Sequence, residues 1–555
     1  MTKKLVSLFL ALMMLLSSSA LAEMVAEITD VTTQGLAATD VLTGMPTPEL
    51  PLVNEPLTLT VKFPRQPNHG DFDNMWFLKE VAEKTGITLK VEPIEATGWT
   101  ERLSLDFASG DYSDIYLGGI TFNDAGIYGT AGMLLPLEEL VAEYAPNAQK
   151  ILDTLPDSRK NITSSDGHIY VMPAFDTPGR DMIVKSGFLN DKWLENLGLE
   201  RPTTVDELYD CLVAVRDNDA NGNGDPNDEI PLSYVYSASS TNWGAGVTIL
   251  YAYGFVDMRH DVIDDQYVFV PMQDNFREYL KYMNKLYEEN LLDKEIFTQS
   301  DAQYNAKLAE YTVFMTSPEM QQSFSDENRQ IEYSLVGPLT SAVSPVKTWG
   351  AQSSEKVGSG AMCITDKCDE KKAIAAIKLL DYLYSEQASF MTKCGPEKGK
   401  WDGVGGWSRT GVKEDGSVAY SIDYNSEKYN SFWDFRCANG LMNIPFLYTS
   451  VHAELVLGAS VWGSHMSKSA YASGAYAARR FGYPSGVTFT EDEQDILAPF
   501  VLLDSYVDQN VAKFITGALD IEDDTTWENY IQTIKDMDVD TLIEVRQEAY
   551  DRWNG

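Results

Sequence analysis

Cysteine and histidine are both scarce in this 555-residue chain, which has 5 of each. Five scattered cysteines are too few, and odd in number, for a disulfide scaffold. Cys363 and Cys368 are near enough in sequence to pair, whereas Cys211 falls on the apolar face of an expected helix and should be a buried thiol. The histidines have no spacing typical of a zinc site. The chain must therefore be stabilised mainly by hydrophobic cores.

Positive charge is the second scarcity. Lys and Arg number 43 against 83 Asp and Glu, so the formal net charge is −40. A field of that sign repels phosphate backbones and anionic lipid head groups, which disfavours nucleic-acid binding. The acidic excess favours solubility but identifies no ligand. Because single cores stop growing near roughly 250–300 residues, at least two domains or lobes are expected.

Long apolar runs are absent except at the N-terminus. Lys3 and Lys4 precede the run "LVSLFLALMMLL", and Ala20 and Ala22 form an A-x-A pattern. This order predicts a secretory signal peptide over residues 1–22. No cysteine stands at the expected cleavage site, so we expect an exported protein without a lipid anchor, either periplasmic or extracellular and associated with the cell surface. Residues 23–54, rich in Thr, Pro, Ala and Glu, are predicted to be a flexible leader.

Strand and helix patterns alternate through the first third of the chain. Apolar residues alternate over 57–63, helical spacing follows over 74–86, and 87–94 again reads as a strand. A further helix and a strand at 113–119 complete a rhythm typical of an α/β fold with a parallel sheet. Ligands of such sheets bind at the carboxyl ends of the strands. Near residue 170 the pattern breaks at Pro173, which indicates a crossover between lobes, and the C-terminal part is predicted to be helical.

A loop crowded with carboxylates and amides, "DNDANGNGDPNDE", covers residues 217–229. It follows a helix whose start is marked by a capping box of Thr204 and Glu207. Calcium takes six to eight oxygen ligands, and glycine allows the tight turn that such a loop needs. Magnesium fits less well because it takes fewer protein ligands in strict octahedral geometry. We therefore predict one structural Ca²⁺ site, and a single site argues against a calcium sensor.

Two registers fit the calcium loop. One begins at Asp217 and the other at Asp219, and they share most of their ligands. The predicted ligand set is Asp219, Asn221, Asn223, Asp225, Asp228 and Glu229, to which the first register adds Asp217.

The stretch around this loop resembles a known family. Its motifs are W-L-x-x-L-G at 193–198, P-T-T-x-D-E-L at 202–208, D-x-N-G-N-G at 219–224 and D-E-I-P at 228–231. They resemble the extracellular solute-binding proteins of carbohydrate ABC importers, in the calcium-containing group with alginate-binding and LplA-type proteins. Together with "NKLYEENLLDKEIFTQ" at 284–299 and "AIAAIKLLDYLYSEQ" at 373–387, the likeness covers most of residues 57–390.

The resemblance implies a two-lobed, type II-like periplasmic-binding-protein fold with hinge crossovers. It implies a sugar held between the lobes, delivery to an ABC permease, a monomeric protein and the calcium register that starts at Asp219, although the loop is about one residue longer here. The expected first lobe is 55–172 plus about 310–370. The expected second lobe is 173–309 plus about 371–555, including the calcium loop.

Sugars bind to aromatic platforms flanked by polar side chains. Trp residues in Gly-rich or polar loops are the better candidates, because Trp in regular amphipathic helices is usually core. Asn74 and Trp76 follow the first strand, and Asp176 and Arg180 lie near the expected hinge. The predicted ligand-binding residues are Asn74, Trp76, Asp176, Arg180, Trp243, Trp349, Trp407 and Trp433.

Two other functions remain open at this point. A secreted, calcium-stabilised glycoside hydrolase would need two carboxylates about 5–9.5 Å apart, and no local motif singles out such a pair. A binder of peptides, lipids or other solutes with the same fold, or a surface adhesin, would share the lobed pattern. The motifs G-x-S-x-G, H-E-x-x-H and the P-loop are absent. We therefore predict a binding protein and no enzyme.

Overall fold

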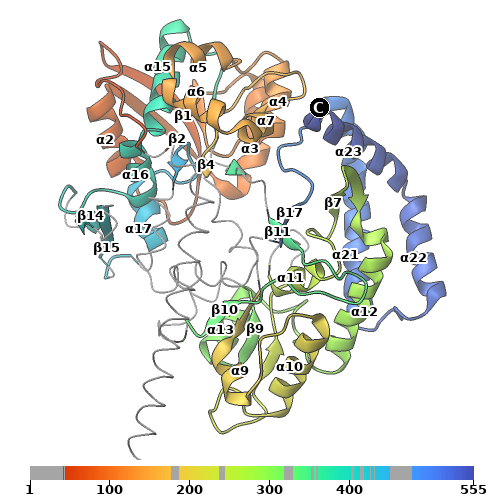
Figure 1. Cartoon of the computed structure of the whole chain (residues 1–555). Coiled ribbons are helices and arrows are strands. Elements are labelled where there is room, and N and C mark those ends of the chain that lie inside the picture. The colour runs from red at the N-terminus through yellow and green to blue at the C-terminus, as the bar shows by residue number, and fades with distance from the viewer. Residues whose placement is uncertain are drawn as a thin grey trace, which may run out of the picture.

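The computed structural model places two α/β lobes one above the other, with strands of the connecting segments between them (Figure 1). The structure describes residues 44–176, 187–236, 244–317, 331–351, 356–357, 361–401, 405–412, 418–425, 427–429, 432–449 and 478–555, together with Leu42 and Arg329. The predicted signal peptide and the first part of the predicted leader lie outside these residues. Within the described residues, no helix is both long and apolar enough to cross a membrane.

The first lobe is built on a four-stranded sheet in the order β13-β3-β1-β2. The strands β1 (Leu57–Arg65), β2 (Ile87–Glu95) and β3 (Ile115–Leu117) are parallel, whereas β13 (Met362–Ile364) runs antiparallel to β3. The helix α2 (Trp76–Thr85) ends at Gly86, whose φ of 75° is readily adopted by glycine at a helix end. The predicted parallel strand–helix rhythm is therefore observed.

Helices on both sides of this sheet complete the first lobe (Figure 1). They are α3 (Trp99–Ser109), α4 (Phe122–Thr130), α5 (Glu138–Tyr144), α6 (Pro146–Thr154), α7 (Pro156–Ile162), α15 (Glu370–Leu383), α16 (Glu386–Cys394) and α17 (Phe432–Asn439). A hairpin of β14 (Gly405–Val412) and β15 (Val418–Tyr424) projects beside α16 and α17.

The second lobe has its own four-stranded sheet in the order β10-β5-β9-β6. Its strands are β5 (Phe188–Asn190), β6 (Ile230–Leu232), β9 (Val313–Thr316) and β10 (Tyr333–Leu335), and a separate hairpin joins β7 (His260–Ile263) to β8 (Gln266–Phe269). Its helices are α9 (Asp191–Leu197), α10 (Val205–Asp217), α11 (Ala245–Tyr251), α12 (Asp274–Glu288), α13 (Asp301–Ala309), α20 (Glu491–Leu497), α21 (Val501–Ile515), α22 (Asp524–Asp536) and α23 (Val539–Asn554).

The helix α10 shows why these elements form where they do. Thr204 accepts a hydrogen bond from the Glu207 amide and Glu207 binds back to the Thr204 amide, so the predicted capping box is confirmed. Its apolar face, with Leu208 and Leu212 at 0% exposure, packs into the core of the second lobe. Cys211 on the same face is buried, as predicted.

Three segments connect the lobes and form two small sheets. The strand β4 (Phe175–Asp176) pairs with β12 (Lys356–Val357) and with β16 (Leu447–Tyr448). The strand β11 (Trp349–Ala351) pairs in parallel with β17 (Arg479–Phe481). The predicted crossover near residue 170 corresponds to β4. We call these five strands the hinge strands.

The observed lobes differ from the predicted boundaries. Residues 310–349 were expected in the first lobe, but β9 and β10 complete the sheet of the second lobe. The helices α15 and α16 were expected in the second lobe, but they pack into the core of the first. A strand pattern does not say which sheet the strand joins, because that choice depends on contacts distant in sequence.

Two further expectations are corrected. The segment 44–54 was predicted to be flexible, but Met45 and Leu52 are buried in the core of the first lobe. The Leu52 amide also donates to the Thr85 carbonyl at 2.9 Å, so this part of the predicted leader is structural. Cys363 and Cys368 do not pair, and all five cysteines are free thiols.

Candidate functional site

The carboxyl edge of the first-lobe sheet carries the first group of candidate residues. Asn74 follows β1 in an exposed turn, where its amide donates to Asp71 Oδ2 at 2.7 Å and accepts from Lys79 Nζ at 3.1 Å. The indole of Trp76 is 4% exposed and packs in the core of the first lobe. At this edge the structure therefore leaves Asn74 accessible and gives Trp76 a packing role.

His69 lies at the same edge and was not singled out from the sequence. Its Nδ1 accepts from the Gln66 amide at 2.8 Å, and its ring contacts Phe63 and Phe72 edge-on or tilted. Burial, with a contribution from Arg65, lowers the pKa of His69 to about 4. The imidazole is therefore neutral at physiological pH and carries its proton on Nε2, which has no hydrogen-bond partner among the described residues. Its place just after a predicted strand was the available signal.

The remaining predicted aromatic contacts are spread over both lobes. Trp349, in β11, is 0% exposed and packs on Tyr251 with ring centroids 5.4 Å apart. Trp407, in β14, is half-buried against Phe390 at 5.1 Å. In the described conformation Trp76 and Trp349 expose almost no ring surface, so packing accounts for both indoles. A ligand contact by either stays a prediction without structural support.

Four predicted ligand residues cannot be placed fully. Asp176 ends β4 and so lies among the hinge strands, and Trp433 lies on α17, but the side chains of both are outside the described part of the chain. Arg180 and Trp243 lie outside the described residues altogether. For these four residues, ligand contact stays a prediction.

The acidic loop connects α10 to β6 in the second lobe. Asp217 is tied to the neighbouring Arg216 guanidinium at 2.7 Å, which holds its pKa below the usual range. Asp219 instead turns into the loop and accepts from the amides of Asn223 and Gly224 at 3.0 and 2.9 Å. The two carboxylates therefore have different surroundings, and the register that begins at Asp219 is the one closed by loop contacts.

The other predicted ligands fold around the same turn. Gly222 and Gly224 have φ values of 73° and 94°, a region that favours glycine. The side-chain amides of Asn221 and Asn223 donate to the two oxygens of Asp228 at 3.2 and 2.7 Å. The loop therefore already gathers side-chain oxygens, although its amide nitrogens face the carboxylate of Asp228.

Glu229 closes the loop from the strand side. Its Oε1 accepts from the amides of Ala220 and Asn221 at 2.8 and 3.4 Å, whereas its buried Oε2 has no partner among the described residues. Burial raises the pKa of Glu229, and the neighbouring Asp228 raises it further. An unpartnered buried carboxylate oxygen beside a second carboxylate is the chemistry that a hard cation satisfies.

The donor set fits calcium better than a transition metal. No group of three or more His, Cys, Asp or Glu side chains arranged for metal binding occurs among the described residues. The loop instead mixes carboxylates with asparagine amides, which supply the carbonyl oxygens that Ca²⁺ accepts. Turning the amides of Asn221 and Asn223 by half a rotation would present these oxygens in place of nitrogens.

Residues 67–389, more than half of the chain, match the family described as bacterial extracellular solute-binding protein. The chain belongs to this family. Members of this family bind solutes outside the cell and are not enzymes. The match therefore confirms the prediction of a binding protein and places the chain in an extracellular class.

Curated relatives resemble only part of this solute-binding protein. The fructooligosaccharide ABC transporter substrate-binding protein FusA of Streptococcus pneumoniae is 31% identical over 292 residues, which are 50% of this chain and 53% of FusA. The solute-binding protein spans about half the length of the curated relatives it matches.

Solved structures match over nearly the whole chain. The HMO binding ABC-transporter associated solute binding protein from Bifidobacterium longum infantis superposes with a TM-score of 0.73 at 18% identity, over 90% of this chain and 99% of that one. An EF-hand mutant of S. pneumoniae FusA in complex with fructo-nystose gives a TM-score of 0.65 at 22% identity, with the same coverage. These likenesses confirm the predicted α/β solute-binding-protein fold.

Proposed function

We propose that this solute-binding protein captures an oligosaccharide between its two lobes and delivers it to the permease of an ABC importer. The observation that carries the proposal is the family match, together with the 31% identity to a fructooligosaccharide-binding relative. The arrangement of two separate cores joined by hinge strands supports it, because a ligand that contacts both lobes shifts their equilibrium toward a closed form.

Ligand contacts are proposed for two accessible positions. Asn74 offers an amide at the carboxyl edge of the first sheet, and Trp407 offers a half-exposed indole on the hairpin of β14 and β15. An amide can bind sugar hydroxyls, and an indole can stack on the apolar face of a pyranose or furanose ring. Asp176, Arg180, Trp243 and Trp433 belong to the same proposal from their places in the sequence.

Calcium is proposed as a structural ion in the loop between α10 and β6. The register that starts at Asp219 is supported by the pairing of Asp217 with Arg216 and by the unpartnered Oε2 of Glu229. The residues that would hold the ion are Asp219, Asn221, Asn223, Asp225, Asp228 and Glu229. Bound calcium would neutralise this acidic loop and tie α10 to the sheet of the second lobe.

A ligand screen tests the main proposal. The purified protein is mixed with kestose, longer fructooligosaccharides, other short oligosaccharides and a peptide mixture, with calcium held constant. The expected result is a rise in melting temperature with one class of oligosaccharide and no release of new reducing ends. A shift with peptides alone would overturn the carbohydrate proposal, and release of reducing ends at a steady rate would indicate a hydrolase.

A further inference from the structure

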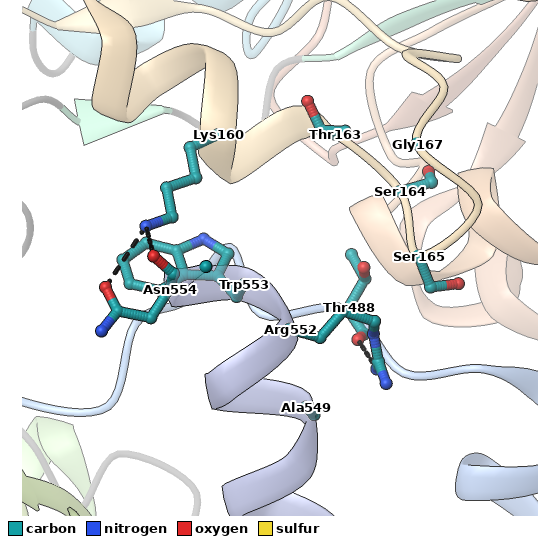
Figure 2. Close-up of a pocket in the computed structure, with 11 residues that line it drawn as sticks. Lys160, Thr163, Ser164, Ser165, Gly167, Thr488, Ala549, Arg552, Trp553 and Asn554 are labelled. Carbon is teal, nitrogen blue, oxygen red and sulfur yellow. Dashed lines mark hydrogen bonds between the residues drawn. The ribbon is translucent and has the colours of Figure 1, made fainter. Parts of the chain in front are cut away.

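The two lobes also touch outside the hinge strands, where the end of α23 meets α7 (Figure 2). Lys160 of α7 places its ammonium 4.2 Å from the centre of the Trp553 ring and donates to the Asn554 carbonyl at 3.1 Å. Asn161 accepts from Trp553 Nε1 at 3.2 Å. A helix of the first lobe is therefore held by the last turn of the second.

The segment just before α20 adds two contacts to this one. The Phe489 amide donates to Asn123 Oδ1 in α4 at 3.1 Å. Gly486 approaches α7 so closely that a Cβ atom on it would lie 2.3 Å from Asn161 Oδ1 and 2.5 Å from Asn161 Cα. Val487 and Phe489 pack with Tyr550 of α23, so this segment belongs to the second lobe. We call this set of contacts the seam contact. Its first-lobe residues are Asn123, Lys160 and Asn161, and its second-lobe residues are Gly486, Phe489, Trp553 and Asn554.

The seam contact lies close to the hinge but is not part of its strands. The helix α7 packs beside the hinge strand β12. A hollow of about 440 Å³ adjoins the contact and is lined by both lobes, with Ser164 on one side and Thr488 on the other (Figure 2). The lobes therefore meet here through a few polar side chains and a glycine, and no hydrophobic cluster of the described residues joins them at this place.

Such a contact is strong enough to bias a motion and weak enough to break. A hydrogen bond contributes roughly 0.5–1.5 kcal/mol net, and interfaces between domains that are small and polar permit relative motion. Because the contact is near the hinge strands, a small displacement at Gly486 changes the angle between whole lobes. The contact of Gly486 with Asn161 limits how closely the lobes approach, whereas the Lys160 and Trp553 contacts resist their separation.

We infer that the seam contact is a brace that sets the angle between the lobes and thereby tunes ligand affinity, with Asn161, Gly486 and Trp553 as positioning residues that do not touch the ligand. The inference about affinity rests on the proposed function. The inference about the lobe angle rests on the seam geometry alone.

A wedge at Gly486 tests the brace directly. Its φ lies outside the region that disfavours side chains, so Gly486→Ala introduces a clash with Asn161 and no backbone strain. Gly98→Ala is the matched control, because a Cβ there meets nothing within 4 Å. We expect Gly486→Ala to change the small-angle scattering profile of the ligand-free protein and to speed exchange of the Phe489 amide by about tenfold or more, with no such change in Gly98→Ala. An unchanged profile and exchange rate in Gly486→Ala would overturn the inference.

Removing the cation tests the brace without a clash. Lys160→Met deletes the ammonium over Trp553, and Lys285→Met deletes an equivalent ammonium over Tyr209, 3.5 Å from the ring centre, within the second lobe. We expect Lys160→Met alone to speed Phe489 exchange and to change the Kd of the bound oligosaccharide at least threefold. An equal Kd and exchange rate in Lys160→Met and the wild type would contradict the brace. If no oligosaccharide binds at all, the proposed function fails, while scattering and exchange still decide on the brace.

Discussion

Two carboxylates, the buried Asp381 in the first lobe and the half-buried Glu229 in the second, have their hydrogen-bonding needs met in different ways. Asp381, on α15, is 2% exposed and accepts from the amides of Asn147 and Ala148 at 2.6 and 3.0 Å. It thereby caps the first turn of α6 from a helix distant in sequence. Glu229 binds two loop amides with one oxygen and leaves the other buried and unpartnered among the described residues.

The difference teaches how each lobe is stabilised. The carboxylate of Asp381 is used by the chain itself, because it supplies acceptors that the start of a helix lacks. The carboxylate of Glu229 lies beside the negative charge of Asp228, and no cation is among the groups that shift its pKa. We therefore expect the first lobe to depend on its internal contacts and the second to depend on a cation from solution.

The largest expected effect concerns a buried ion pair of the first lobe. Lys62 and Asp106 are each 2% exposed, and Lys62 Nζ donates to Asp106 Oδ2 at 2.5 Å. Lys62→Met removes the buried cation of Asp106, while Arg102, 44% exposed, stays at 2.7 Å and compensates the carboxylate in part. We therefore expect the first lobe to lose about 3 kcal/mol of unfolding free energy, the lower end of the range for a broken buried pair. Hydrogen exchange of β1 and β2 in denaturant measures it. Lys84→Met breaks a partly exposed pair with Glu80 and should change the unfolding free energy by about 0–1 kcal/mol. Equal effects of the two substitutions would contradict the argument.

The second expected effect concerns pH and Asp381. Burial raises the pKa of Asp381 to about 6, above its ordinary value of 3.8, although the two amides oppose the shift. The folded state therefore binds this proton more tightly, so stability from this group is present below pH 4 and is lost as pH rises through 6. At about 1.4 kcal/mol per pKa unit the loss is at most roughly 3 kcal/mol.

Asp381→Asn keeps the acceptor for both amides and removes the titration. We expect the unfolding free energy of the first lobe to be higher in the variant than in the wild type at pH 7, and the difference to vanish near pH 4. Denaturant unfolding at several pH values measures this. Parallel pH profiles for the two proteins would show that Asp381 does not titrate in this range.

The third expected effect sharpens the comparison in the second lobe. Calcium at a hundred times its Kd should stabilise the protein by about 2.7 kcal/mol, and EGTA should reverse this. Asp219→Ala should abolish the response, whereas Asp217→Ala should retain it because Asp217 pairs with Arg216. Thermal unfolding with and without calcium measures both variants. Loss of the response in Asp217→Ala alone would favour the other register, and no calcium response in the wild type would remove the proposed site.

The smallest expected effect is one that the lobes should share. Thr121 caps α4 in the first lobe and Thr204 caps α10 in the second, each in a complete capping box. Thr121→Ala and Thr204→Ala should each lower the unfolding free energy of their own lobe by about 1 kcal/mol. Lobe-resolved hydrogen exchange measures the two losses. A loss several times larger in one lobe would show that the cap there is coupled to other contacts.

Local sequence patterns predicted the acidic loop of the second lobe and the helix before it. They did not predict which distant segments pack together in that lobe. Thr204, Glu207 and the apolar face of α10 act through contacts within one helix, so their roles follow from spacing. The choice between Asp217 and Asp219 was open, because it depends on where the Arg216 guanidinium lies. Burial of Trp76 and Trp349 was also hidden. The place of Trp76 just after a strand and the loop-like sequence around Trp349 do not reveal which core each ring enters.

The sequence by itself determined the α/β rhythm, the acidic loop and the likeness to solute-binding proteins, because these depend on short-range spacing and composition. Only the tertiary structure decided that β9 and β10 join the second lobe, that α15 and α16 return to the first, and that Gly486 meets Asn161. Those contacts join residues far apart in the chain. They form where surfaces fit and bury apolar area together, and no local pattern records that fit.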